Sequence, residues 1–221
     1  MNYRSEMNKA LKAYFKSLGF KYVPQEGGGN YEKYYNDDIL YTILITDEKR
    51  YMPRCFWLDI LLFVDSVKFN KIIEELTEGF LNEWSVLVFI TVPSWKEPHV
   101  EFIEERPMEE NVRLFQEHME NVAFPILEKF TDTRQIITSV LHDDFVIKRN
   151  RKEDMFTRPI ALYLEGESQK AAEYMDEYMA ELERCLSLNP GNTLVIDEIK
   201  RYQPFQKNLT QWMKEGRILD L

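Results

Sequence analysis

The chain contains two nearly uninterrupted apolar runs, from Cys55 to Val64 and from Trp84 to Val92. Both runs have the length of a strand and are rich in β-branched and aromatic residues, which is typical of strands covered on one or both faces. Both are also too short to cross a bilayer as helices. We therefore expect the two runs to form the middle of a sheet, and the rest of the fold has to cover them.

Helical and strand-like patterns precede the first run. Apolar side chains at helical spacing predict a helix over residues 2–18. The segments Asn30–Tyr35 and Ile39–Thr46 then predict a β-hairpin, because they are rich in strand-forming residues and flank a polar turn. We expect Asp47–Pro53 to form a polar loop that leads into the long strand.

A strand–helix–strand order follows. The spacing of apolar residues predicts a helix from Val67 to about Phe80 and a short edge strand at Val100–Ile103. The connection between the two apolar runs is short, so the sequence leaves open whether they pair in parallel. At Glu104–Pro107 the apolar period changes from strand-like to helical. We therefore expect an α+β sheet region over residues 1–106 and a helical region packed on it over residues 107–221, within one compact domain.

Helical periodicity dominates the chain after this change, and we expect four or five helices there. Pro125 should end or kink the first of them, and Pro204 should kink the last. The alternation of Ile160, Leu162 and Leu164 leaves open whether residues 156–165 form a helix or a strand. The remaining predicted segments are a helix from Pro107, a helix that Asp132 caps and that ends near Leu141, a polar connection over His142–Glu153, a helix that Ser168 caps and that ends near Ser187, and a helix from about Thr193.

Taken together, the patterns predict an α+β fold. We expect a mixed, mainly antiparallel sheet of about five strands packed with helices, followed by a helical C-terminal half. The sequence shows no internal repeat that would favour a solenoid.

The charge of the chain is negative and evenly distributed. It has 28 Lys and Arg against 38 Asp and Glu, a net charge of −10. Residues 1–105 contribute 12 − 17 = −5, and residues 106–221 contribute 16 − 21 = −5. Nonspecific binding to nucleic acid or to an anionic membrane needs a concentrated positive surface, so we expect neither. The charge suits a basic protein partner.

Cysteine usage and hydropathy indicate the compartment. The chain has two cysteines, Cys55 in a predicted strand and Cys185 on a predicted helix, and we expect two free buried thiols. The chain opens directly into an amphipathic helix without a signal-peptide pattern, and its apolar stretches are shorter than a membrane span. We therefore expect a cytoplasmic protein.

Three motifs could be read as sites of chemistry. His142-Asp143-Asp144 could contribute to a metal site if further ligands came from elsewhere, although acidic residues at a helix end explain it as well. His118 has no nucleophile placed near it by the sequence, as acid–base catalysis would need. Gly27-Gly28-Gly29 leads into a predicted strand rather than a helix, which favours a hairpin turn over a phosphate loop. We expect no catalytic residue, no cofactor and no metal.

Two charged segments are candidate binding surfaces. Lys148–Lys152 is the densest basic run, but acidic residues flank it, so a solvated loop is the alternative to a nucleic-acid site. Acidic residues gather on the helix that begins near Ser168, and Glu173, Asp176 and Glu177 among them could dock a basic protein. A solvated helix face is the alternative interpretation.

An aromatic set lies in and beside the predicted sheet. If one face of the sheet is open, these rings would line a shallow binding surface. Cross-strand packing within the core is the alternative explanation. The residues of this set are Tyr31, Tyr34, Tyr35, Tyr41 and Trp95.

The opening of the chain resembles a known family. Residues 8–46 have the order of a helix, Leu18-Gly19-Phe20-Lys21, a glycine-rich break, and a tyrosine-rich strand followed by an alternating one. This order is similar to the opening of DUF4304-type bacterial proteins. The resemblance covers a part of the chain only, and it implies an α+β fold and a bacterial source without any catalytic residue.

Three functions are compatible with these features. The favoured hypothesis is a noncatalytic protein-binding module, of which an immunity protein that neutralises a basic toxin is one version. The alternative is a small-ligand-binding protein or an enzyme whose pocket lies between the sheet and the helices. A nucleic-acid binder acting through residues 148–152 is the third.

Overall fold

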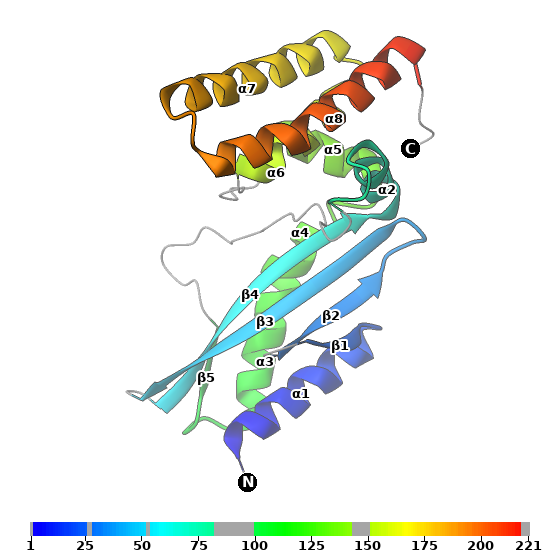
Figure 1. Ribbon diagram of the computed structural model, residues 1–221. Coiled ribbons are helices and arrows are strands. Elements are labelled where there is room, and N and C mark those ends of the chain that lie inside the picture. The colour runs from blue at the N-terminus through cyan, green and yellow to red at the C-terminus, as the bar shows by residue number, and fades with distance from the viewer. Residues whose placement is uncertain (1, 26–27, 52–53, 82–99, 143–150, 218–221) are drawn as a thin grey trace. The chain divides into compact units, whose positions relative to one another are not determined.

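The computed structural model describes residues 2–25, 28–51, 54–81, 100–142 and 151–217 (Figure 1). The contacts within the chain divide it into two compact units. Of the described residues, the sheet unit holds 2–66 and 100–132, and the helical unit holds 67–81, 133–142 and 151–217. The predicted run from Trp84 to Val92 lies outside the described residues.

The sheet unit contains a five-stranded antiparallel sheet in which each strand pairs with the one before it (Figure 1). This arrangement and the helices elsewhere confirm the predicted α+β fold. The first apolar run forms the central part of β4, as expected. The strands are β1 (Lys21–Gln25), β2 (Gly28–Tyr34), β3 (Ile39–Tyr51), β4 (Arg54–Ser66) and β5 (Val100–Ile103).

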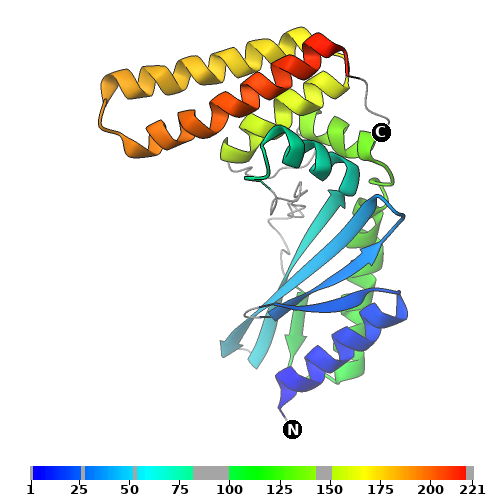
Figure 2. The ribbon, with the colours of Figure 1, turned by 45° about the vertical axis from the view of Figure 1, so that its right-hand side comes forward.

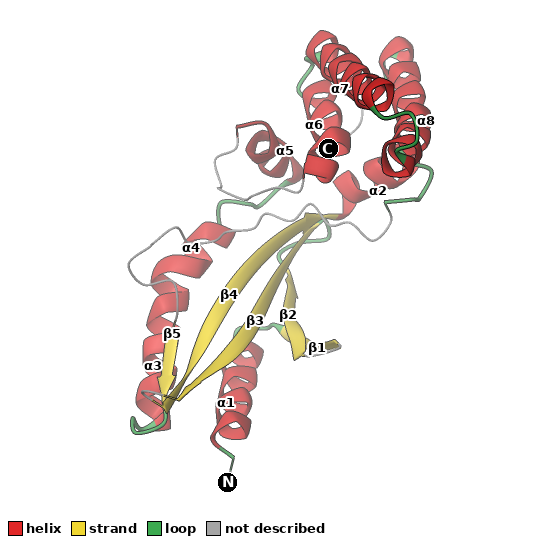
Figure 3. Ribbon diagram, turned by 60° about the vertical axis from the view of Figure 1, so that its left-hand side comes forward, coloured by secondary structure: helices red, strands yellow, loops and turns green. Residues whose placement is uncertain are grey.

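One face of the sheet carries most of its buried side chains, because successive residues of a strand point to opposite faces. On β3, Tyr41 and Ile43 lie on this face, opposite Val64 and Leu62 of β4. Two helices, α1 (Tyr3–Ser17) and α3 (Met108–His118), pack side by side against it (Figure 3). Aromatic rings join the layers, since Phe15 stacks on Tyr31 at 4.1 Å between ring centroids and Phe115 contacts Phe102 at 6.1 Å.

Both ends of α1 follow from local sequence. The side chain of Asn2 accepts a hydrogen bond from the Arg4 backbone N–H at 3.2 Å, which caps the first turn. Gly19 adopts a φ of +85°, and the Phe20 N–H then donates to the Phe15 carbonyl at 2.9 Å. This is the Schellman ending, in which a left-handed residue satisfies carbonyls of the last turn.

A buried amide fixes the junction between β5 and α3. Asn111 is fully buried, and its Oδ1 accepts hydrogen bonds from the Ile103 backbone N–H at 3.1 Å and from Arg106 at 3.2 Å. Its Nδ2 donates to the Tyr3 hydroxyl at 2.8 Å and to the Ile103 carbonyl at 2.9 Å. The same side chain thereby holds α1, β5 and α3 in place.

The helix after β5 continues past Pro125 in a modified form. Residues Met119–Ala123 form a π-helical turn between α3 and α4 (Phe124–Leu127), and the Phe124 N–H donates to the Met119 carbonyl. A proline has no N–H and crowds the preceding turn, which a wider turn relieves. The interruption expected at Pro125 therefore takes the form of a π turn.

The helical unit buries a single apolar core. Its largest buried side chains include Phe156 of α6, and Tyr202 and Phe205 of α8. The helices α7 and α8 pack against each other and run antiparallel (Figure 2). The unit consists of α2 (Val67–Leu76), α5 (Thr133–His142), α6 (Arg151–Leu164), α7 (Ser168–Leu188) and α8 (Thr193–Glu215).

Several predicted boundaries differ from the structure. Asp47–Tyr51 belongs to β3 rather than to a loop, because it pairs along its length with β4. Gly28 and Gly29 lie in β2 rather than in a turn, since they pair with Gln25 and Pro24. Residues 156–164 are helical, which settles the alternative that the sequence left open.

Smaller differences concern helix ends. α2 ends at Leu76, before the predicted end near Phe80. α6 begins at Arg151, inside the predicted polar connection. Ser168 is the first residue of α7 and not its cap, since the capping position is Glu167. Pro204 lies inside α8.

The two units do not follow the boundary expected between residues 106 and 107. The helices α3 and α4 lie after this boundary, yet they belong to the sheet unit. The helix α2 lies before it, yet α2 belongs to the helical unit, where it contacts α6 and α8.

Candidate functional site

A cavity lies between α1 and the sheet, beside the first residues of β2, where β3 continues beyond its pairing with β2. The pairing of β2 with β3 extends from Tyr34–Leu40 to Asn30–Leu44, whereas β3 runs on to Tyr51 in contact with β4. The cavity has a volume of about 380 Å³. Its lining residues are Arg4, Met7, Asn8, Leu11, Lys12, Tyr22, Gly29, Tyr31, Leu44, Ile45, Thr46, Asp47 and Leu58.

The floor of the cavity is apolar. Met7 and Leu11 point from α1 toward the sheet, and Leu58 faces them from β4. All three are buried, with at most 2% of their surface exposed. This floor follows from helical spacing on α1 and strand alternation on β4, the two patterns that build the core of the unit.

Two tyrosine rings border the cavity. Tyr22 and Tyr31 are cross-strand neighbours on β1 and β2, with ring centroids 5.5 Å apart. Gly29 leaves the space that the Tyr22 ring occupies, because a Cβ at this position would lie 2.4 Å from the ring. The Lys12 ammonium lies 3.7 Å from the centroid of the Tyr22 ring, within the range of a cation–π contact.

The polar rim is organised by an ion pair. Arg4 donates to both carboxylate oxygens of Asp47, at 2.8 Å from Nε and 2.6 Å from Nη2. The Asp47 side chain is 12% exposed, whereas that of Arg4 is 55% exposed. Asn8 and Lys12 follow Arg4 at intervals of four residues, so the three side chains share one side of α1.

The protonation of Tyr31 follows from its burial. Removal from water disfavours the phenolate and raises the pKa of Tyr31 to about 12, with a smaller contribution from Tyr22. The Tyr31 hydroxyl is therefore neutral near pH 7, where it can donate or accept a hydrogen bond but cannot act as a base.

The predicted aromatic set is dispersed over the sheet unit. Tyr31 and Tyr41 are buried, and the Tyr41 hydroxyl donates to the Phe130 carbonyl at 2.9 Å. Tyr34 and Tyr35 are 62% and 50% exposed. Of these four residues Tyr31 alone lines the cavity. Trp95 lies outside the described residues.

The predicted acidic residues share one exposed side of α7. Glu173, Asp176 and Glu177 are three and four residues apart, and all are exposed. Glu173 accepts a hydrogen bond from Gln169 at 2.9 Å, and Asp176 accepts one from Gln206 at 2.8 Å. Within the described part of the chain these three carboxylates form no ion pair.

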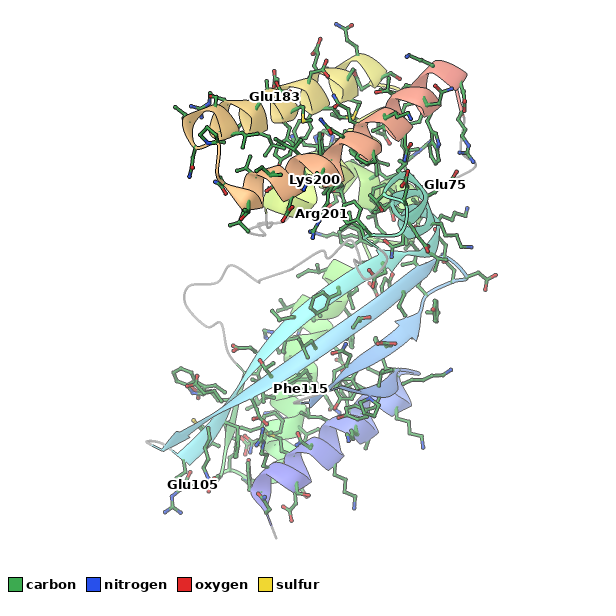
Figure 4. All side chains as sticks on the ribbon, in the orientation of Figure 1. Glu75, Glu105, Phe115, Glu183, Lys200 and Arg201 are labelled. Atoms are coloured by element: carbon green, nitrogen blue, oxygen red, sulfur yellow. The ribbon has the colours of Figure 1, made fainter. Side chains whose placement is uncertain are left out.

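Two neighbouring carboxylates at and on the same helix form ion pairs with basic side chains. Glu167 and Glu181 pair with Lys170 at 3.1 Å and with Arg184 at 2.6 Å. Glu183 is exposed on the same helix (Figure 4). The acidic surface of Glu173, Asp176 and Glu177 therefore lies between these two ion pairs and has none of its own among the described residues.

The remaining sequence candidates do not form a site among the described residues. Burial lowers the pKa of His118, which lies at the end of α3, and His142 is the exposed last residue of α5. Asp143, Asp144 and residues 148–150 lie outside the described residues. In the part of the chain that the structure describes, no group of three or more His, Cys, Asp and Glu side chains could hold a metal ion.

Cysteine pairing and membrane spans can be assessed over the same residues. Cys55 is buried and Cys185 is half-buried, and neither of them forms a disulfide. None of the described helices is both long enough and apolar enough to span a bilayer.

No protein-family model, no curated protein and no solved structure matches this chain. The resemblance of its opening to DUF4304-type proteins stays a prediction.

Sequence reasoning missed most of the cavity. It named Tyr31 but neither the Arg4–Asp47 pair nor Lys12, because Asp47 was assigned to a loop. One signal was available: Arg4, Asn8 and Lys12 form a polar stripe directly beside Met7 and Leu11. Such a stripe is also typical of any solvent-exposed helix side, so the sequence could not distinguish the two cases.

Proposed function

We propose that this protein is a noncatalytic binding protein that holds a small organic molecule in the cavity between α1 and the sheet. The observation that supports this proposal is the cavity of about 380 Å³ with an apolar floor and a polar rim. Small-molecule sites of roughly 300–1,000 Å³ commonly have this composition, with a few polar groups that orient the ligand.

The chemistry of the lining residues favours binding over catalysis. Its titratable side chains are Arg4, Lys12, Asp47 and the two tyrosines. Asp47 is engaged by Arg4, and Tyr31 stays protonated, so neither is placed to remove a proton from a ligand. Nucleophilic catalysis would need a nucleophile beside an activating base, and the described lining residues include no histidine or cysteine.

The proposal is tested with a neutral apolar fluorophore, N-phenyl-1-naphthylamine, whose emission rises on transfer from water into an apolar site. We expect saturable enhancement with the unchanged chain. Asn8→Trp should remove it, because Asn8 is an exposed lining residue and an indole there would block the mouth. Ala13→Trp is the matched control, since Ala13 is exposed on the same helix and does not line the cavity. Equal enhancement in both variants would contradict the proposal.

A second candidate function is docking of a basic protein, of which an immunity-type interaction with a basic toxin is one version. It is favoured by the exposed acidic surface of Glu173, Asp176 and Glu177, which lacks compensating cations among the described residues. Complementary charge would raise the rate of association and make it sensitive to salt.

This second candidate is tested by affinity capture at low and high salt. The triple variant Glu173→Gln, Asp176→Asn and Glu177→Gln should lose the captured protein, because it loses three charges from one surface. A triple variant at Glu109, Glu110 and Glu120 is the matched control, since these exposed residues lie on α3 and the π turn of the sheet unit. Capture that is insensitive to salt and to both variants would argue against this function.

A further inference from the structure

The cavity also contains information about the class of its ligand. We infer that it binds an amphipathic anion, with the anionic head at Arg4 and Lys12 and the apolar body against the half-buried lining residues Tyr22 and Ile45. This inference rests on the proposed function, because it names the ligand of the same cavity.

The local charge is the first argument. The described lining residues carry two cations, Arg4 and Lys12, and one anion, Asp47, which gives 2 − 1 = +1. Residues 2–25, which form α1 and β1, hold five Lys and Arg against the single acid Glu6, a sum of +4. The whole chain has a net charge of −10. The cavity therefore opens at a positive part of an acidic protein, where the potential attracts anions.

The supply of hydrogen-bond donors is the second argument. Asp47 engages Nε and Nη2 of Arg4, so Nη1 of the same guanidinium has two N–H groups directed elsewhere. The Lys12 ammonium contacts the π face of Tyr22 and keeps its N–H groups for an oxygen acceptor. Since Asp47 already accepts two hydrogen bonds, the charged groups of the rim mainly offer donors, and a carboxylate or phosphate matches them.

The positions of Arg4 and Lys12 are the third argument, because both cations are held before a ligand arrives. Arg4 is fixed by the bidentate contact with Asp47, and Lys12 is fixed over the Tyr22 ring, which itself occupies the space left by Gly29. Charged side chains that are already ordered lose less conformational entropy on binding.

The size of the cavity limits the apolar body. A volume of about 380 Å³ equals the liquid volume of roughly a dozen water molecules at ~30 Å³ each. A short alkyl or aryl body with one acidic head fits this space. Carboxylates and monoesters of phosphate share this chemistry, so both are included in the test.

The test uses four probes with the same alkyl chain: octanoate, octyl phosphate, octan-1-ol and octylamine. Their affinities for the full chain are measured by isothermal titration calorimetry. We expect octanoate or octyl phosphate to bind about tenfold more tightly than octan-1-ol, because of one charge-assisted contact. Octylamine should bind most weakly, because its charge repels both cations. The stronger of the two anions identifies the head group.

A pair of variants locates the charge effect. Lys12→Gln should lower the affinity for the better anion about tenfold and leave that for octan-1-ol unchanged. Lys16→Gln removes the same charge from an exposed position of α1 that does not line the cavity, and it should change neither affinity. If both variants lose the same affinity for the anion, the effect is one of long-range charge. That result would overturn the assignment of the head group to Lys12.

The outcomes separate this inference from the proposed function. If octan-1-ol and octylamine bind as tightly as the anions and Asn8→Trp blocks all of them, the cavity is a ligand site but the inference about charge is wrong. If none of the four probes binds and N-phenyl-1-naphthylamine is not enhanced either, both are wrong. Selective binding of the anions that Lys12→Gln weakens and Lys16→Gln does not would support both.

Discussion

The sheet unit and the helical unit each bury a large polar side chain completely, and they treat it in opposite ways. Asn111 of the sheet unit makes hydrogen bonds to Ile103, Arg106 and Tyr3. Tyr202 of the helical unit is also fully buried, but its hydroxyl has no hydrogen-bond partner among the described residues. Rings surround it instead, with Phe156 and Phe205 each 5.5 Å away between centroids.

This difference shows that polar contacts fix the surroundings of Asn111, whereas ring packing fixes those of Tyr202. In the sheet unit a polar contact selects one arrangement of α1, β5 and α3, because no apolar residue of similar size could satisfy the same backbone groups. Around Tyr202 the contacts are between rings, and burial of a hydroxyl without a described partner lowers the free energy of unfolding. Replacing the polar groups of Asn111 and Tyr202 should therefore change the free energy of unfolding in opposite directions.

The largest expected effect is at Asn111. Asn111→Leu should lower the free energy of unfolding by about 3 kcal/mol, because it leaves buried donors and acceptors without partners. Urea denaturation measures the loss, and hydrogen exchange should place it in the sheet unit. Asn121→Leu is the matched control, since Asn121 is exposed on the adjoining π turn. If Asn111→Leu lowers the free energy of unfolding by less than Asn121→Leu does, the hydrogen bonds of Asn111 contribute little to stability.

The next effect is a loss of stability at high pH that arises in the sheet unit. Tyr31 has a pKa of about 12 in the folded chain against 10.0 in the unfolded chain. Between these values the unfolded chain releases the proton first, so stability present below pH 10 is lost as the pH rises toward 12. We expect the part of the unfolding free energy that is lost through Tyr31 to be about 2 kcal/mol. Tyr31→Phe should reduce the slope of unfolding free energy against pH in this range, and an unchanged slope would contradict the assignment.

A moderate effect is expected at Gly29. Gly29→Ala should destabilise the sheet unit by about 1.5 kcal/mol, because the added Cβ overlaps the Tyr22 ring and the ring has to move. Movement of the ring also disrupts the cation–π contact that holds the Lys12 ammonium in place. The variant should therefore weaken binding of octanoate or octyl phosphate, whichever binds the unchanged chain. Thermal unfolding and calorimetry measure the two effects, and full retention of both stability and binding would show that the ring can shift freely.

The smallest effect is expected at Tyr202 and has the opposite sign. Tyr202→Phe should raise the free energy of unfolding by up to about 1 kcal/mol, because it removes a buried hydroxyl without a described partner. Tyr178→Phe is the matched control in the same unit, since the Tyr178 hydroxyl donates to Glu198 and its removal should lower stability. Destabilisation in both variants would imply a partner for Tyr202.

Much of the fold could be predicted from periodicity. The first helix, the hairpin of β2 and β3, the long strand β4, the edge strand β5 and the α7–α8 pair follow from apolar spacing and turn residues. These features are local, since each depends on residues within one or two elements. The second apolar run lies outside the described residues, so its pairing stays a prediction.

The cavity and the Asn111 network could not be predicted in the same way. The cavity depends on how far β3 extends beyond β2, and its rim joins Arg4 to a residue 43 positions away. At α3 the structure buries Asn111 completely and leaves the neighbouring apolar Val112 half-buried. Apolar spacing carries no information about a polar residue that is buried because it finds a partner far away in the sequence, as Asn111 does 108 positions from Tyr3.

The π turn has a consequence for the phase of its helix. Asn111, Phe115, Met119, Ala123 and Leu127 are spaced four residues apart, and all five are buried. In a regular α-helix a step of four residues rotates by about 40° beyond a full turn, so a column of five such positions would wind well round the cylinder. The wider turn at Met119–Ala123 reduces this rotation. If Met119–Ala123 wound as a regular α-helix instead, each of its residues would rotate further, and Leu127 would turn out of the interior while the chain up to His118 kept its place.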